Sequence, residues 1–183
     1  MKTLIINGSP RKNGDTSALL NEFKAHISGE VVEISAYYDK IAPCVDCRRC
    51  WEKRGCVIND KMSLIYEDDY DILLIASPVY MHNLPGQIMN IASRFQMYYA
   101  AGRFLKDPIK RSEKRAVLLL AAGGDGGAGP AIESAKLIFK TMNAQFDESN
   151  LAASLKTDTI PAKDDAEALE KVRGIAERMN EGV

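Results

Sequence analysis

Short apolar runs alternate along this chain with stretches in which apolar residues recur every three or four positions. The apolar runs cover residues 3–6, 31–35, 72–76, 116–122 and 151–155, and they predict five strands. The stretches with helical spacing lie between and after these runs, which predicts a parallel sheet with crossover helices on both faces. At about 150 residues per domain, the 183 residues are expected to form a single α/β domain spanning 1–183.

The composition of the strands favours one order within the sheet. Runs 3–6, 72–76 and 116–122 are almost entirely apolar, as central parallel strands buried on both faces should be. Runs 31–35 and 151–155 contain more polar or small residues, which edge strands tolerate. Edges at strands two and five fit the doubly wound order 2-1-3-4-5, in which ligands bind beyond the carboxyl ends of strands one and three.

Four helices with one apolar face each are expected, together with a short helix near Met62 to Tyr66. Their faces consist of Leu19, Leu20, Phe23 and Ile27; of Ile88, Ile91, Phe95 and Tyr98; of Ile132, Ala135, Ile138 and Met142; and of Leu169, Val172, Ala176 and Met179. The connection at about residues 36–60 is unusually long, and connections of that length are more often functional than incidental.

The loop after the first strand has the composition of an anion site. It reads Asn7-Gly8-Ser9-Pro10-Arg11-Lys12-Asn13-Gly14-Asp15-Thr16-Ser17 and leads into a helix. Backbone N–H groups and the positive end of the helix dipole would face an anion there. No Gly-Lys-Ser/Thr follows the glycines, so it is not a Walker loop. The alternative is an ordinary glycine-containing turn with a Thr or Asp helix cap, and we favour a phosphate site.

Two further loops follow the third and fourth strands. The first reads Ser77-Pro78-Val79-Tyr80-Met81-His82-Asn83-Leu84-Pro85-Gly86; it could border a flat heterocycle, although by itself it also matches an ordinary strand-to-helix connection. The second reads Gly123-Gly124-Asp125-Gly126-Gly127-Ala128-Gly129-Pro130. It contains a GxGxxG spacing, but that dinucleotide motif belongs to a first βα unit. We interpret it as a loop whose backbone closely approaches a ring system.

Taken in this order, the three loops resemble the NADPH-dependent FMN reductase branch of the flavodoxin-like superfamily. The resemblance implies a flavodoxin-like fold, FMN as cofactor and NAD(P)H as reductant, with the FMN phosphate on the first loop and the isoalloxazine between the other two. The residues that it assigns to FMN are Ser9, Arg11, Asn13, Gly14, Thr16, Ser17, Ser77, Pro78, Val79, Tyr80, Asn83, Gly123, Gly124 and Asp125. Met81-His82 departs from the aromatic-Gly pair often found before that Asn, and His82 is a candidate proton donor.

All four cysteines lie within the long connection, at Cys44, Cys47, Cys50 and Cys56, with the spacing C-x2-C-x2-C-x5-C. In a reducing compartment this spacing suggests a metal site before a disulfide. Zinc usually takes two CxxC pairs with a longer spacer, whereas a compact run is typical of a [4Fe–4S] site. Unmetallated thiols, adventitious zinc and a disulfide formed during handling stay open as alternatives.

Together with the FMN loops, the cysteine spacing is similar to that of the iron-sulfur flavoprotein family. This resemblance implies a [4Fe–4S] cluster beside FMN, and subunits that associate as a homodimer or homotetramer. Because the cysteine loop follows an edge strand, we expect a long distance to the flavin of the same chain. By analogy with that family alone, a flavin of a neighbouring subunit is the hypothesised electron partner.

Charge and hydropathy exclude several other classes. The chain has 24 Lys and Arg against 25 Asp and Glu, a formal net charge of -1 that argues against binding to nucleic acid or to an anionic membrane surface. No apolar run approaches the roughly 18 residues of a membrane span, and the N-terminal run is too short for a signal-peptide core. A cytoplasmic protein is therefore expected.

The sequence thus predicts an FMN-dependent oxidoreductase that passes electrons from NAD(P)H to an acceptor. The acceptor is expected to be a small molecule or a ferredoxin-like protein, and a cluster would split the hydride into one-electron steps. Two alternatives are a flavodoxin-like electron carrier without its own substrate site, and a zinc or thiol redox-sensor module that uses the cysteines alone.

Overall fold

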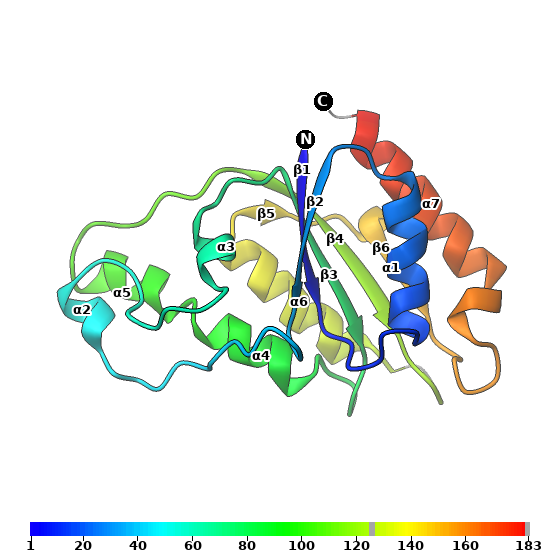
Figure 1. Ribbon diagram of the computed structural model, residues 1–183, viewed down its shortest axis with the longest axis horizontal. Helices are drawn as coiled ribbons and strands as arrows, with labels where there is room; N and C mark the ends of the chain where they lie inside the picture. The colour runs from blue at the N-terminus through cyan, green and yellow to red at the C-terminus, as the bar shows by residue number, and fades with distance from the viewer. Residues whose placement is uncertain (125–126, 182–183) are drawn as a thin grey trace.

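The computed structural model describes residues 1–124 and 127–181 and contains one parallel sheet (Figure 1). Its strands are β1 (Lys2–Asn7), β2 (Glu30–Ser35), β3 (Ile72–Pro78), β4 (Lys114–Ala121), β5 (Ala144–Gln145) and β6 (Leu151–Ser154). The order is β2-β1-β3-β4-β5, and β6 also pairs with β4. The predicted order 2-1-3-4-5 is confirmed.

Two short strands share the fifth position, where the sequence predicted one. β5 pairs with the start of β4 at Lys114, and β6 pairs with its second half from Leu118 to Ala121. A 3-10 helix (Glu148–Asn150) separates the two segments. β5 has only two residues, too few for an apolar period to be visible in the sequence.

Helices cover both faces of the sheet, as predicted, because the strands are apolar on both sides. Ile5 and Leu74 pack with α1 (Asp15–His26) and α7 (Ala166–Glu181), whereas Leu4 and Leu73 pack on the opposite side. This alternation follows the two-residue period of a strand. The opposite side carries α3 (Ser63–Tyr66), α4 (Gly86–Ser93), α5 (Gln96–Arg103) and α6 (Gly129–Thr141). Among the described residues, no helix combines the length and the apolar character needed to cross a membrane.

The prediction of one continuous helix through Ile88, Ile91, Phe95 and Tyr98 is wrong. The chain forms α4 and α5 instead, although all four of these residues are buried. At the junction, the N–H groups of Arg94 and Phe95 donate to carbonyls three residues back, at 3.0 Å each. Such 3-10 bonds tighten the chain and change its direction. The apolar period continues across the junction and therefore hides it.

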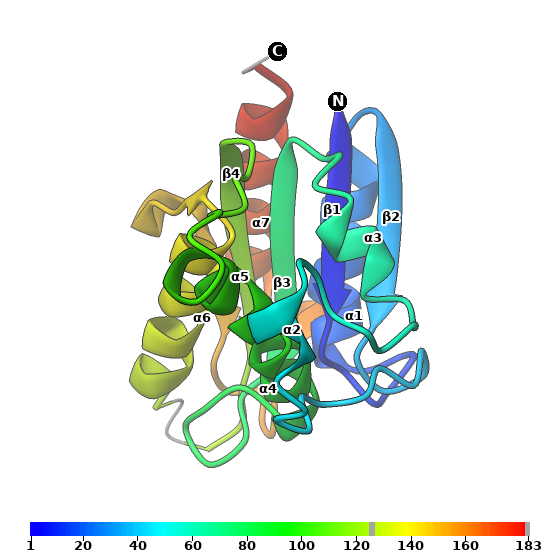
Figure 2. The same cartoon turned by 90° about the vertical axis from the view of Figure 1, so that its left-hand side faces the viewer.

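The cysteine-bearing connection lies over α4 and α5, on the side of the sheet opposite to α1 and α7 (Figures 1 and 2). It contains a four-residue helix, α2 (Arg49–Glu52), that the sequence pattern did not predict. α2 contacts α5 rather than the sheet. The connection is therefore attached to the fold through helices and its own side chains.

Gly8 begins the first loop at a point where the backbone approaches α4 closely. A Cβ at this position would lie 2.4 Å from Cδ1 and 2.9 Å from Cγ1 of Ile88, which is 1% exposed. We expect Gly8→Ala to destabilise the protein by about 1–3 kcal/mol through overpacking, measured by urea unfolding. Gly86→Ala is the matched control, because its Cβ would meet no described atom within 4 Å. Equal unfolding midpoints for both variants would contradict this account of the packing.

Candidate functional site

The three predicted flavin loops start at neighbouring strand ends. β1 lies beside β3, and β3 beside β4. The N–H of Gly8 donates to the carbonyl of Ala76 at 2.8 Å, and the N–H of Val79 donates to that of Ala121 at 2.9 Å. The parallel ladders therefore continue into the loops and bring the three loops to one edge of the sheet, where ligands bind in doubly wound folds.

The first loop is folded around the main chain of Arg11. The hydroxyls of Ser9 and Ser17 both donate to the Arg11 carbonyl, at 3.1 and 2.9 Å. The Arg11 N–H in turn donates to the Ser9 oxygen at 3.2 Å. Both predicted serines are buried and thus shape the loop from within.

The start of α1 has no side-chain cap among the described residues. Gly14 is the N-cap residue there. The Thr or Asp cap of the alternative interpretation is therefore not formed among the described residues. Asp15 instead accepts from Arg11 Nη2 at 2.8 Å and from the Ala162 N–H at 3.1 Å. The N–H groups of the first helical turn have no helical acceptor, and an anion can supply one.

Tyr38 is a residue beside this loop that sequence reasoning missed. Its hydroxyl donates to the carbonyl of Pro10, and Lys12 Nζ lies 5.3 Å from the centre of its ring. Tyr38 also lines one hollow with Ser9, Arg11 and Ser17. Its position shortly after the second strand was the available signal, since β2 and β1 are neighbours.

The second loop turns sharply at the two residues that depart from the family pattern. Tyr80 and Asn83 exchange two backbone hydrogen bonds of 2.9 Å, and the residues between them, Met81 and His82, have φ of 50° and 63°. Two central residues with positive φ form a type I′ turn, for which Asn and Gly are preferred. Met81 is 94% exposed, so this strained turn presents its side chain to solvent.

His82 joins the second loop to the third. Its Nδ1 donates to the carbonyl of Gly127 at 2.7 Å, and its own carbonyl accepts from the N–H of Ala131 at 3.0 Å. A Cβ at Gly127 would lie 2.3 Å from His82 Nδ1, so this contact needs glycine. Asn83 Oδ1 accepts from Ser134 Oγ at 2.9 Å, a contact that the sequence did not predict.

The predicted flavin residues fall into three groups by exposure. Ser9, Thr16, Ser17, Ser77 and Pro78 are buried; Gly14, Val79 and Asn83 are half-buried; Arg11, Asn13, Tyr80, Gly123 and Gly124 are exposed. Gly124 has φ of +64°, which glycine adopts freely. Asp125 lies outside the described residues.

The four cysteines line one hollow. Cys44 and Cys47 are exposed, Cys50 and Cys56 are half-buried, and none of the four is in a disulfide. Burial raises the pKa of the Cys50 thiol, and the charges of the other three thiols add to this effect. The four sulfurs are therefore within electrostatic reach of one another.

The described residues do not form a ready-made site for a single metal ion. Among the described residues, no three His, Cys, Asp or Glu side chains gather closely enough to hold one metal ion. A tetrahedral zinc site with Zn–S bonds of about 2.3 Å would need its sulfurs much closer together than the span of a cluster. Four cysteine thiolates around one hollow are the ligand set of a [4Fe–4S] cluster.

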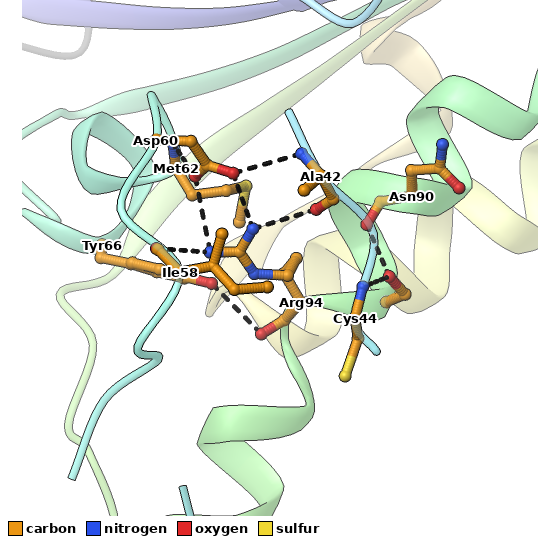
Figure 3. Close-up of polar contacts among 9 residues, drawn as sticks. Ala42, Cys44, Ile58, Asp60, Met62, Tyr66, Asn90 and Arg94 are labelled. Atoms are coloured by element: carbon orange, nitrogen blue, oxygen red, sulfur yellow. Dashed lines mark hydrogen bonds and ion pairs between the residues drawn. The ribbon is translucent and has the colours of Figure 1, made fainter. Parts of the chain in front are cut away.

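Arg94 holds both ends of the cysteine connection (Figure 3). Its side chain is 0% exposed. Nη1 donates to the Ala42 carbonyl at 2.9 Å and to Asp60 at 2.8 Å, while Nη2 donates to the Ile58 carbonyl at 3.0 Å. Burial would raise the pKa of Asp60, but the hydrogen bond from Arg94 lowers it overall. Sequence reasoning missed this residue; a charge inside an apolar helical stripe was the available signal.

Aromatic rings cover the outer side of the cysteine segment. Trp51 stacks on Phe104 with a centroid distance of 4.1 Å and an interplanar angle of 20°, and the Arg48 guanidinium lies 4.8 Å from the Trp51 ring. Arg54 forms an exposed ion pair with Asp107 at 2.6 Å. These contacts explain how α2 is attached to α5.

The family model for NADPH-dependent FMN reductases matches residues 1–158. The chain belongs to the NADPH-dependent FMN reductase family. Membership makes it an FMN-dependent NAD(P)H oxidoreductase, and it confirms the family prediction made from the three loops.

Curated relatives carry the name iron-sulfur flavoprotein. The protein of Methanosarcina thermophila is 30% identical over 139 residues, which are 73% of this chain and 70% of that protein. A protein of Methanocaldococcus jannaschii is 34% identical over 138 residues, which are 72% of this chain and 66% of that protein. About a third of each relative's own length therefore lies outside the match.

Solved structures share the fold at low sequence identity. An FMN-dependent NADH-azoreductase from Bacillus anthracis, determined in complex with FMN, has a TM-score of 0.68 and 17% identity, covering 98% of this chain and 100% of that one. A WrbA-like flavodoxin from Agrobacterium tumefaciens has a TM-score of 0.62 and 12% identity, covering 98% and 95%. The prediction of a flavodoxin-like sheet is confirmed.

The contact to Gly127 fixes the tautomer of His82. Because a carbonyl can only accept, the Nδ1 of His82 must carry a proton, which leaves Nε2 of the neutral ring as an acceptor. We expect long-range ¹H–¹⁵N NMR of the neutral ring to show the proton on Nδ1. Neutral His82 then cannot donate through Nε2, and only its imidazolium form could act as the predicted proton donor. A neutral ring protonated on Nε2 would contradict this geometry.

Proposed function

We propose that FMN binds across the three loops at the carboxyl edge of the sheet and takes a hydride from NAD(P)H. The observation that carries this proposal is the start of α1 at Gly14, which has no side-chain cap and follows the loop that leaves β1, the neighbour of β3. A helix start without a cap binds a phosphate readily, and the two other loops lie at the adjacent strand ends.

Each part of the site has a proposed role. The N–H groups at the start of α1, with Thr16, Asn13 and the Arg11 guanidinium, hold the FMN phosphate, while Ser9 and Ser17 keep the loop in shape. The isoalloxazine lies between the second loop (Ser77, Pro78, Val79, Tyr80 and Asn83) and the third (Gly123, Gly124 and Asp125). When bound, FMN supplies two-electron and one-electron chemistry, and the protein supplies position and charge.

We extend the proposal to the cysteines, as the holders of a [4Fe–4S] cluster. Support comes from the single hollow that all four line, and from the relatives named iron-sulfur flavoprotein. Such a cluster would supply one-electron transfer toward a small-molecule acceptor or a ferredoxin-like protein. A homodimer or homotetramer in which the flavin of a neighbouring chain is the electron partner is part of this proposal, and its support is the resemblance to the iron-sulfur flavoprotein family.

The first test measures FMN affinity. Ser17→Ala removes the hydroxyl that donates to the Arg11 carbonyl at 2.9 Å. Since one hydrogen bond contributes about 0.5–1.5 kcal/mol, we expect the Kd for FMN to rise about 2- to 13-fold in a fluorescence titration. The matched control is Thr141→Ala, which removes a hydroxyl-to-carbonyl bond of 2.8 Å at the end of α6. An unchanged Kd in Ser17→Ala would argue against FMN at this loop.

The second test measures metal and sulfide after anaerobic purification and reconstitution. We expect bound FMN together with about four irons and four sulfides per chain. A variant with Ser at positions 44, 47, 50 and 56 should lose the iron and keep the flavin, because the two sites are built by different segments. Zinc without iron, or iron retained in the variant, would refute the cluster assignment.

A further inference from the structure

The Arg94 guanidinium has one N–H donor, at Nε, that has no acceptor among the described residues. The guanidinium makes bonds to two main-chain carbonyls and to Asp60, yet its Nε has no partner among the described residues. The same side chain is fully buried and lines the hollow together with the four cysteines. A buried N–H without an acceptor is unfavourable, so an acceptor in that hollow would complete the arrangement.

Asp60 is not free to act as that acceptor. Its Oδ2 already accepts from Arg94 Nη1 and from the Ala42 N–H at 3.2 Å, and its Oδ1 accepts from the Met62 N–H at 3.1 Å. The carboxylate therefore ties together the same two chain segments as the guanidinium. Arg94 and Asp60 form one clamp across the base of the cysteine connection.

Cys56 is half-buried, lines the same hollow as Arg94, and lies two residues before Ile58, whose carbonyl accepts from Arg94 Nη2. Burial acts to lower the pKa of Arg94, but Asp60, Tyr66 and Cys56 together raise it above its ordinary value. The charge of Cys56 is one of the causes that raise the pKa of Arg94.

We propose that Arg94 is a positioning residue of the cysteine site: it clamps residues 42 and 58–60 together, and it donates its free N–H to the Cys56 sulfur when the four cysteines hold an iron–sulfur cluster. The donor half of this proposal rests on the proposed function of the cysteines, whereas the clamp half does not. Hydrogen bonds to cluster sulfurs and nearby positive charge stabilise the reduced, more negative state. Arg94 is therefore expected to raise the reduction potential of the site.

The test compares four variants with the wild-type holoprotein. Arg94→Lys keeps the charge but has a compact ammonium that cannot span three acceptors and a sulfur. Arg94→Gln removes the charge and leaves Asp60 unpaired, and Arg94→Gln combined with Asp60→Asn avoids the unpaired carboxylate. Arg54→Gln is the matched control, since Arg54 lies in the same connection and also pairs with a carboxylate, that of Asp107, but is exposed.

The first readout is amide hydrogen exchange of residues 42–60 in metal-free, FMN-loaded protein. We expect about tenfold faster exchange in Arg94→Lys and in the double variant, and wild-type exchange in Arg54→Gln. FMN affinity should stay unchanged in all of them, which separates the clamp from global unfolding. Wild-type exchange in both Arg94→Lys and the double variant would overturn the clamp.

The second readout is the rate of iron loss and the midpoint potential of the reconstituted protein. In Arg94→Lys and the double variant we expect iron loss to a chelator to be at least about tenfold faster. The midpoint potential should be lower than in the wild type in both, because the N–H donor is lost, and lowest in Arg94→Gln, which removes the positive charge and leaves the Asp60 carboxylate unpaired. Wild-type iron retention and potential in both would overturn the donor role. If the wild-type protein itself takes up no iron and sulfide, both the cluster assignment and the donor role of Arg94 are refuted. The hydrogen-exchange measurement then still decides whether Arg94 clamps residues 42 and 58–60.

Discussion

The parallel pairing of β1 with β3 is the interaction on which the flavin site depends. Asn7 lies opposite Ala76 at the end of this ladder, so the first and second loops leave the sheet at the same level. These strands are separated by more than sixty positions along the chain, and burial of both faces between two helical layers holds them together. A one-residue slip of either strand would exchange its two buried faces and separate the loops.

The cysteine connection is held in place by a buried ion pair, whereas the flavin loops are positioned by the pairing of buried strands. The connection between residues 42 and 60 has few apolar anchors, and a buried ion pair takes their place. Arg94 lies in the junction between α4 and α5, and its side chain is buried. A buried charge must be paired, so Arg94 and Asp60 fix the position of the connection at one point.

The sheet order, the three loops and the set of four cysteines could be predicted from the sequence, because each depends on local composition. Continuous apolar runs identify central strands, and Gly14 with its neighbours identifies a phosphate-type loop before any contact is known. Contacts between distant residues were not accessible in this way. His82 with Gly127, Asn83 with Ser134 and Arg94 with Asp60 are each more than 30 residues apart, and no local pattern marks them.

We propose that this member of the FMN reductase family binds one FMN at the edge of β1, β3 and β4 and reduces it with a nicotinamide. An anaerobic titration of the FMN-loaded protein with NADPH and with NADH, followed by its absorbance spectrum, tests this most directly. We predict one FMN per chain, and bleaching of the flavin band by about one equivalent of at least one of the two nucleotides. A protein that fails to bind FMN, or a bound flavin that neither nucleotide reduces, would contradict the account.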